Sequence, residues 1–153
     1  MPKTWNSDSN LVHAVAENLF QALPMFPKRL VRVDELVREH GMPFSHILIL
    51  IMLDEESISI GQISDRLGIA KPNITPLIDS MKEQGLVERV RSAEDRRIVN
   101  VCLQPGGKAK LDAIRGDIAA QVAGWKGNLS RSEVKELSNA FASIVRIAGS
   151  IGE

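Results

Sequence analysis

The sequence has few of the features that mark secreted, membrane-spanning or disulfide-stabilised proteins. Its one cysteine, Cys102, excludes an internal disulfide and with it a fold that depends on an oxidising compartment. The longest apolar run, ILILIML at 47–53, is far shorter than the roughly 20 residues that a membrane helix needs, so we interpret it as a buried helix. The first residues, MPKTWNSDSN, are polar and lack the apolar segment of a signal peptide. We therefore expect a cytoplasmic protein.

Motifs that carry catalysis or hold a cofactor are also missing. There is no glycine-rich phosphate loop, no nucleophile elbow and no histidine with an evident carboxylate partner, so we expect no enzymatic activity and no cofactor. His13, His40 and His46 are far apart and lack the spacing of metal ligands, which predicts no metal site. Cys102 lies between two apolar residues without an adjacent cation, and we interpret it as a small hydrophobic residue rather than a redox sensor.

The composition is that of an ordinary globular chain, but the charge is unevenly spread. The 153 residues fit one domain, or one domain with arms. The hydrophobic fraction of 44% and the charged fraction of 25% are typical of soluble chains. Net charge is zero overall, yet residues 58–110 hold 9 Lys and Arg against 6 Asp and Glu, while residues 1–57 hold 5 against 8. The basic charge is therefore concentrated in the middle of the chain.

The N-terminal part shows two helical patterns. Across residues 8–23 apolar residues recur every three or four positions, and a second such pattern runs through residues 30–41, where Gly41 has the form of a C-terminal cap. Pro24 and Pro27 separate the two patterns. The sequence therefore predicts either one kinked helix or two helices.

Two helices and a turn signal follow. Ser45 is in place to cap the apolar helix 46–54. Ser59 and Gln62 have the form of a capping box, which opens a short helix that ends at Gly68.

The stretch IAKPNITPLIDSMKEQG, residues 69–85, has helical spacing despite its two prolines. Pro72 falls in the first turn of a helix that starts at Lys71, where the missing N–H has no helical partner in any case. Pro76 removes the hydrogen bond to the carbonyl of Pro72, which predicts a modest local bend. In an alternative register, Thr75 caps a helix that starts later.

A predicted hairpin and two helices complete the chain. Residues 86–91 and 98–103 contain many β-branched residues and flank the charged turn SAEDRR, which predicts a two-stranded hairpin. A Pro-Gly-Gly segment then separates the hairpin from a helix over 108–125. Ser130 and Glu133 have the form of a second capping box, which opens a final helix with one apolar face.

This order of elements is that of a winged helix-turn-helix, with a short helix over 61–67, a second helix over 71–84 and a hairpin wing. In such proteins the second helix enters the DNA major groove and its first residues meet base edges. We assign groove contacts to Lys71, Asn73 and Thr75, because asparagine pairs with adenine and lysine with guanine or phosphate. In the wing we assign phosphate and minor-groove contacts to Arg91, Arg96 and Arg97. We expect the Asp95 carboxylate to hold a neighbouring guanidinium in a fixed geometry.

A series of residues in the basic region matches a known family pattern. It consists of Leu67-Gly68, Lys71, Thr75, Asp79, Gly85-Leu86-Val87, Asp95-Arg96-Arg97, Leu103 and Gly107. This succession, over residues 60–111, resembles the MarR-type transcription regulators. The flanking helices also agree, so the resemblance covers nearly the whole chain.

The resemblance implies a dimeric, α-rich, repressor-like protein whose terminal helices form the dimer interface. It also implies that Arg97 enters a minor groove, that Asp95 orients a neighbouring arginine, and that the protein responds to a small aromatic or phenolic effector. The chain departs from the family pattern at Pro76, where arginine is frequent, and at Gln104, where threonine is common. The proline removes one DNA contact that the family pattern would supply.

The expected fold is mainly α with a small β-hairpin wing: a winged helix-turn-helix flanked by N- and C-terminal dimerisation helices. We expect residues 1–41 to form an N-terminal dimerisation region, 42–104 the DNA-binding domain and 105–153 the C-terminal dimerisation helices. The expected function is a sequence-specific regulator, a repressor that binds a pseudo-palindromic double-stranded operator as a homodimer and responds to a small ligand. The alternative is a winged-helix adaptor that binds protein or a ligand without reading DNA.

Overall fold

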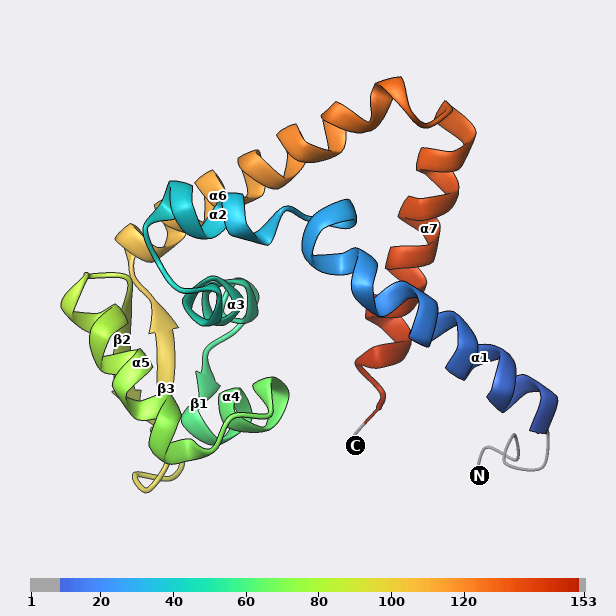
Figure 1. The fold of residues 1–153 in the computed structure, drawn as a ribbon. Coiled ribbons are helices and arrows are strands. Elements are labelled where there is room, and N and C mark those ends of the chain that lie inside the picture. The colour runs from blue at the N-terminus through green and yellow to red at the C-terminus, as the bar shows by residue number, and fades with distance from the viewer. Residues whose placement is uncertain (1–8, 152–153) are drawn as a thin grey trace. The chain divides into compact units, whose positions relative to one another are not determined.

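The computed structural model of this chain describes residues 9–151. It contains two compact units, of which the first extends to Ile118 and the second begins at Ala119. The first unit holds the sheet and the helices that pack beside it (Figure 1). These units do not test the assignment of the terminal regions to dimerisation, which stays a prediction.

Two separate helices open the described part of the chain, α1, Ser9–Ala22, and α2, Val33–His40. The predicted start of the first helix at Asp8 lies outside the described residues. The two prolines lie in short helical segments between α1 and α2, a 3-10 turn, η2, Leu23–Met25, and a π turn, η3, Phe26–Leu30. Val31 is extended, with φ −136° and ψ 124°, so the helical path is broken there. Of the two predicted arrangements, the structure has two helices.

The apolar run forms α3, Phe44–Met52, which buries His46, Ile47, Ile49 and Leu50. The prediction that Ser45 caps this helix is wrong, because the N-cap position is held by Pro43. The Pro43 carbonyl accepts hydrogen bonds from the N–H groups of His46 and Ile47 at 3.0 and 3.4 Å, so Ser45 already lies inside the first turn. Regular helix also stops at Met52, two residues before the predicted end.

The first helix of the helix-turn-helix is α4, Ile60–Leu67, and its predicted capping box is confirmed. The Ser59 hydroxyl accepts a hydrogen bond from the Gln62 N–H at 3.1 Å, and the Gln62 side chain accepts one from the Ser59 N–H at 2.8 Å. Gly68 ends the helix with a left-handed φ of 64°, a conformation that glycine adopts without steric cost.

The second helix, α5, Lys71–Glu83, starts where the first register predicts, with Pro72 in its first turn and Pro76 inside it. The Ala70 carbonyl accepts hydrogen bonds from the N–H groups of Asn73 and Ile74 at 2.8 and 3.3 Å. The alternative, a later start capped by Thr75, is therefore wrong. The Thr75 hydroxyl instead donates back to the Lys71 carbonyl at 3.4 Å, as is common inside helices.

The wing belongs to an antiparallel sheet of three strands in the order β1-β3-β2 (Figure 1). The predicted hairpin is present as β2, Val87–Arg91, and β3, Val99–Leu103, with Val87 opposite Leu103 and Arg91 opposite Val99. A third strand, β1, Ile58–Ser59, pairs with β3 and extends the predicted two-stranded hairpin. This pairing fixes the start of α4 against the base of the wing.

The helix after the wing, α6, Pro105–Ala123, starts three residues earlier than predicted. Its glycines do not break the chain but let the first turn approach a neighbouring backbone. A Cβ built on Gly107 would lie 2.0 Å from the Leu86 carbonyl oxygen, and one on Gly106 would lie 2.8 Å from that of Gly85. The wing exit is therefore packed against the end of the helix-turn-helix.

The second unit contains the end of α6, a 3-10 turn, η4, Gly124–Gly127, and the final helix α7, Arg131–Ala148. The predicted second capping box is confirmed: the Ser130 hydroxyl accepts from the Glu133 N–H at 3.2 Å, and the Glu133 carboxylate accepts from the Ser130 N–H at 2.8 Å. These hydrogen bonds, the backbone one first, lower the pKa of Glu133. Neither α7 nor α1 has a buried residue among those described.

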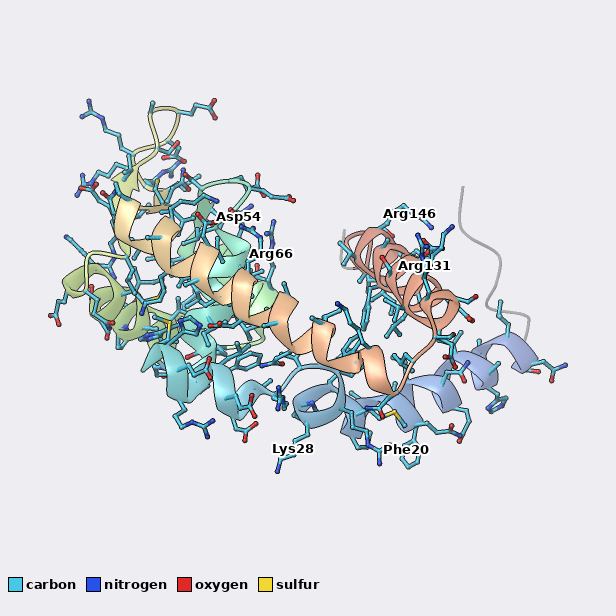
Figure 2. All side chains as sticks on the ribbon, turned by 90° about the horizontal axis from the view of Figure 1, so that it is seen from above. Phe20, Lys28, Asp54, Arg66, Arg131 and Arg146 are labelled. Carbon is cyan, nitrogen blue, oxygen red and sulfur yellow. The ribbon has the colours of Figure 1, made fainter. Side chains whose placement is uncertain are left out.

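The core lies in the first unit and is made of apolar residues from α2 to α6. Its fully buried members include Leu36, Ile47, Ile63, Ile78 and Val101. Figure 2 shows the contrast with α1, from which Phe20 projects with 74% of its surface exposed. Within residues 9–151, no helix is long and apolar enough to cross a membrane.

Candidate nucleic-acid interface

The N-terminal half of α5 shows its polar residues to solvent and buries the opposite side. Ile74 and Ile78 are fully buried on the core face. Lys71, Asn73 and Thr75, the residues predicted to meet a groove, are exposed. The helix is thus held by its apolar face and presents its predicted reading face outward.

The turn of the wing has a defined backbone. The Ser92 N–H donates to the Ile98 carbonyl at 2.9 Å, which extends the hairpin by one pair beyond the strands. The Ser92 hydroxyl accepts hydrogen bonds from the N–H groups of Glu94 and Asp95 at 3.2 and 3.3 Å. Arg96, on this turn, and Arg91, at the end of β2, are both exposed.

Asp95 contacts Arg97; the resemblance implies that Asp95 orients a neighbouring arginine without specifying which. The Asp95 carboxylate accepts from the Arg97 backbone N–H at 3.0 Å, and the Arg97 guanidinium donates to its two oxygens from Nε at 3.2 Å and Nη2 at 3.4 Å. These hydrogen bonds, the backbone one first, lower the pKa of Asp95. The carboxylate therefore stays charged and directs an arginine that is 92% exposed.

A groove of about 360 Å³ brings together two of the predicted site residues from distant parts of the sequence. It is lined by Ser59, Ile60, Gly61, Lys71, Arg97, Ile98 and Val99, and none of these is acidic. A Cβ on Gly61 would lie 3.4 Å from the Lys71 Nζ, so the ammonium group rests against the first turn of α4. This groove is not lined by the other predicted residues, Asn73, Thr75, Arg91, Asp95 and Arg96.

Sequence reasoning gave no role to one ion pair behind this surface. Arg89, on β2, reaches Asp79 on α5 with 2.8 Å between Nη2 and Oδ1. A signal for it exists in the strand periodicity, because Arg89 shares the inward face of β2 with the buried Val87. A charged residue at such a position requires a partner.

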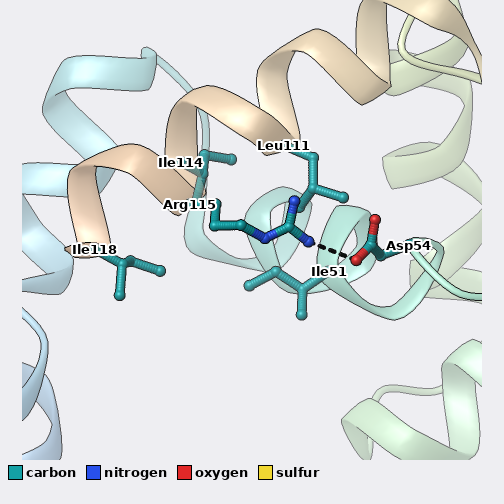
Figure 3. Close-up of a pocket in the computed structure, with 6 residues that line it drawn as sticks. All are labelled: Ile51, Asp54, Leu111, Ile114, Arg115 and Ile118. Atoms are coloured by element: carbon teal, nitrogen blue, oxygen red, sulfur yellow. Dashed lines mark hydrogen bonds and ion pairs between the residues drawn. The ribbon is translucent and has the colours of Figure 1, made fainter.

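A second hollow of the first unit is apolar. It has a volume of about 460 Å³ and is lined by Phe26, Pro27, Val31, Val33, Leu36, Phe44, Ile47, Leu48, Ile51 and Ile118. An adjoining pocket of about 170 Å³ shares Ile51 and Ile118 with it and has Arg115 and Asp54 at its rim (Figure 3). The sequence identified no ligand-binding residue, because these residues come from four separate segments.

Arg115 belongs to an ion network at that rim. Its guanidinium lies 2.5 Å from Asp54 and 3.0 Å from Asp112, and Lys108 contacts the same two carboxylates at 3.4 and 3.2 Å. Partial burial opposes ionisation of Asp54, but the hydrogen bond from Lys108 and the charge of Arg115 outweigh it and lower its pKa. The network therefore ties the end of α3 to α6 while Asp54 is ionised.

The histidines and the cysteine lie in separate settings. His40 contacts Asp117 at 2.8 Å, His46 is buried in α3, and Cys102 is half-buried in β3 with its sulfur 3.0 Å from the Ser57 hydroxyl. Among residues 9–151, no three His, Cys, Asp or Glu side chains are grouped so that they could hold a metal ion.

The chain is similar in sequence to known transcription regulators. A model of the MarR family matches residues 40–98, which span the helix-turn-helix and the wing turn. The chain is 27% identical over 100 residues to the organic hydroperoxide resistance transcriptional regulator of Bacillus subtilis, covering 65% of this chain and 67% of that protein. It is 20% identical over 125 residues to the transcriptional repressor MdtR of the same organism, covering 81% of each.

Solved structures show the same fold. A MarR family protein from Bacillus stearothermophilus superposes with a TM-score of 0.69 at 20% identity, over 93% of this chain and 99% of that one. The apo form of MarR from E. coli superposes with a TM-score of 0.68, also at 20% identity, over 82% of this chain and 96% of that one. The mainly helical architecture with a small antiparallel sheet as its wing is thus the architecture of these structures.

Proposed function

We propose that this chain is a DNA-binding transcription regulator of the MarR type, a repressor that binds a pseudo-palindromic operator as a homodimer. One observation carries the proposal. The exposed start of α5 and the arginine-bearing wing lie at the same end of the first unit, where Lys71 and Arg97 face one groove. Two positively charged side chains and no carboxylate line that groove, which suits a DNA backbone.

In the proposed complex, the start of α5 enters a major groove. Asn73 and Thr75 face base edges, while Lys71 contacts guanine or phosphate. Arg97, aimed by Asp95, enters the neighbouring minor groove, where negative potential is concentrated. Two copies of α5 in a dimer then meet half-sites about 34 Å apart, which requires a pseudo-palindromic operator.

The alternative, an adaptor that does not read DNA, is disfavoured by the same surface. An adaptor does not need an exposed arginine held in a two-pronged contact with a carboxylate. The relatives that the chain matches are transcription regulators by name, and one of them, MdtR, is named a repressor. This supports the repressor assignment over the adaptor.

Binding to duplex DNA at several salt concentrations tests the proposal. We expect the affinity to fall steeply as salt rises, since each phosphate contact adds about 0.9 to the slope of log affinity against log salt. Arg97→Ala should weaken binding by about 1 to 3 kcal/mol, as for one lost DNA contact. Arg38→Ala, which removes an exposed arginine on α2, is the matched control and should bind as the wild type does. Affinity that does not respond to salt would favour the adaptor.

We further propose that a small aromatic anion regulates DNA binding from the apolar hollow. A volume of about 460 Å³ is in the range of small-molecule sites. The shared residues Ile51 and Ile118 place the aromatic body beside Arg115, whose guanidinium can take the anionic group in competition with Asp54 (Figure 3). Such a ligand would loosen the tie between α3 and α6 and change the spacing of the two α5 helices in the dimer.

Benzoate and its neutral counterpart benzyl alcohol test the effector site. We expect benzoate to weaken DNA binding several-fold and benzyl alcohol to have little effect, because only the anion engages Arg115. Arg115→Gln should abolish the difference between the two compounds, whereas Arg38→Gln should keep it. Equal responses to both compounds in the wild type would remove Arg115 from the proposed site.

A further inference from the structure

Arg89 occupies an unusual place for a charged residue. It lies in the middle of β2, on the face that carries the buried Val87, and only 27% of its side chain is exposed. Its Nε is buried and has no hydrogen-bond partner among the described residues. A guanidinium so placed does not point into solvent as Arg91, Arg96 and Arg97 do.

The backbone of Arg89 pairs with Val101 on β3, whereas the polar contacts of its side chain lie on α5. Its Nη2 is 2.8 Å from the Asp79 Oδ1 and donates a hydrogen bond to the Thr75 carbonyl at 3.3 Å. Thr75 and Asp79 are four residues apart and therefore lie on one side of the helix, one turn from each other. The Arg89 Nη2 therefore bridges two residues that lie one turn apart on α5. One of them, Thr75, is predicted to meet DNA, and Arg89 contacts its backbone carbonyl.

This pair differs from an ordinary surface ion pair on one side only, because Asp79 is 51% exposed whereas Arg89 is 27% exposed. Exposed pairs contribute little, because both side chains are as well solvated apart as together. Here Arg89 is largely withdrawn from water, so loss of Asp79 would leave a guanidinium facing the helix without a counter-charge. The pair also joins two separate DNA-contacting elements, the helix for the major groove and the wing for the adjacent minor groove.

We propose that Arg89 is a positioning residue that locks α5 to the wing through Asp79 and the Thr75 carbonyl. The proposal rests on the proposed DNA-binding function. Arg89 itself touches no DNA. It fixes the orientation of the helix relative to the wing, so that Thr75 and Arg97 can engage neighbouring grooves at the same time.

The test compares Arg89→Ala, Asp79→Asn and the double variant on two DNAs: a duplex selected by the wild type from a random pool, and an unrelated duplex. We expect each single variant to lose about ten-fold in affinity for the selected duplex. The double variant should lose no more than Arg89→Ala alone, because the contact that Asp79→Asn weakens is already absent without Arg89. Binding to the unrelated duplex and the salt slope should stay unchanged, since no phosphate contact is lost. Arg91→Ala, two residues along the same strand, is the control and should lower the salt slope on both duplexes.

Amide hydrogen exchange without DNA separates this inference from the proposed function. Asp79→Asn, which conserves shape, should speed exchange in the wing turn and in the first turns of α5 and leave the core of α3 protected. If the wild type selects no DNA sequence, the repressor proposal fails, but the exchange measurement still tests whether Arg89 holds α5 to the wing. Additive losses in the double variant, a lower salt slope for Arg89→Ala, or unchanged exchange in Asp79→Asn would each overturn the inference.

Discussion

At the scale of single residues, His46 is the polar side chain most fully enclosed by the core. It is 3% exposed, and its Nδ1 is buried without a hydrogen-bond partner among residues 9–151. Burial lowers the pKa of His46, because it disfavours the charged imidazolium. The folded protein therefore holds this histidine neutral at pH values where an unfolded chain would protonate it.

The stability of the protein should fall as the pH is lowered through the range in which His46 titrates. Below the unfolded pKa of about 6.5 the unfolded chain binds a proton that the folded chain does not, which favours unfolding by up to about 1.4 kcal/mol per pH unit. The loss continues until the lower, folded pKa is reached. Urea unfolding between pH 8 and pH 5.5 measures it.

His46→Leu should flatten this pH dependence, because no titrating group is left in the core position. His13→Gln, at an exposed site on α1, is the matched control and should keep the wild-type dependence. An identical fall in stability for His46→Leu would show that another group is responsible.

The prolines of α5 are a second residue-scale feature. Pro72 is accommodated by its place in the first turn, whereas Pro76 lies inside the helix on its exposed side. We expect Pro76→Ala to leave the fold intact, measured by circular dichroism, and to change DNA affinity or specificity, because the proline shapes the presented end of α5. Binding curves that superpose on those of the wild type would contradict this expectation.

At the scale of elements, the junction between the wing and α6 depends on the close approach of the Gly107 and Leu86 backbones. Gly107 is buried, and any side chain there would meet the Leu86 carbonyl oxygen at 2.0 Å. Backbone atoms cannot move aside as the end of a flexible side chain can. The Gln104 N–H also donates to that carbonyl at 3.0 Å, which holds the junction further.

Gly107→Ala should therefore destabilise the protein by about 1 to 3 kcal/mol or more, as overpacking does. Gly116→Ala, on the same helix with nothing within 4 Å of the new methyl group, should instead stabilise it by about 1 kcal/mol. Free energies of unfolding in urea give both values. If Gly107→Ala were as benign as Gly116→Ala, the close approach would have no energetic consequence.

At the scale of the whole molecule, α1 and α7 leave large apolar side chains in water. On α1 the exposed fractions reach 58% at Leu19 and 74% at Phe20, and on α7 Val145 is 74% exposed. Apolar stripes of this extent mark surfaces that associate. We interpret them as the surfaces that a second copy covers in the proposed dimer.

Val145→Glu should convert the dimer to a monomer, because it places a charge in an apolar interface. DNA affinity should fall by about a hundred-fold or more, since the second half-site is then no longer held by the first. Lys135→Glu, an exposed polar position on the same helix, is the control and should remain dimeric. Sedimentation velocity measures the state, and a wild type that sediments as a monomer would refute the dimer.

Much of the fold is determined by short-range chemistry that is visible in the sequence. The two capping boxes, at Ser59 and Ser130, and the left-handed Gly68 set helix ends through contacts within a few residues. The antiparallel pairing of β2 with β3 likewise needs only the short turn that joins the two strands. For this reason the helix-turn-helix, the hairpin and the exposed residues Lys71 and Arg97 could be predicted without coordinates.

Other features were decided by tertiary structure, because they depend on groups that are far apart in the sequence. The pairing of Ile58 with Val101 adds a third strand, and the Leu86 carbonyl makes room only for glycine at the start of α6. Arg89 pairs with Asp79, and the distance between these two side chains is set by how β2 packs on α5. The sequence by itself determined the helices and the hairpin, because hydrogen bonds within a few residues decide where these begin and end. Only the tertiary structure decided the third strand and the way α5 is held to the wing, because both depend on the packing of distant segments.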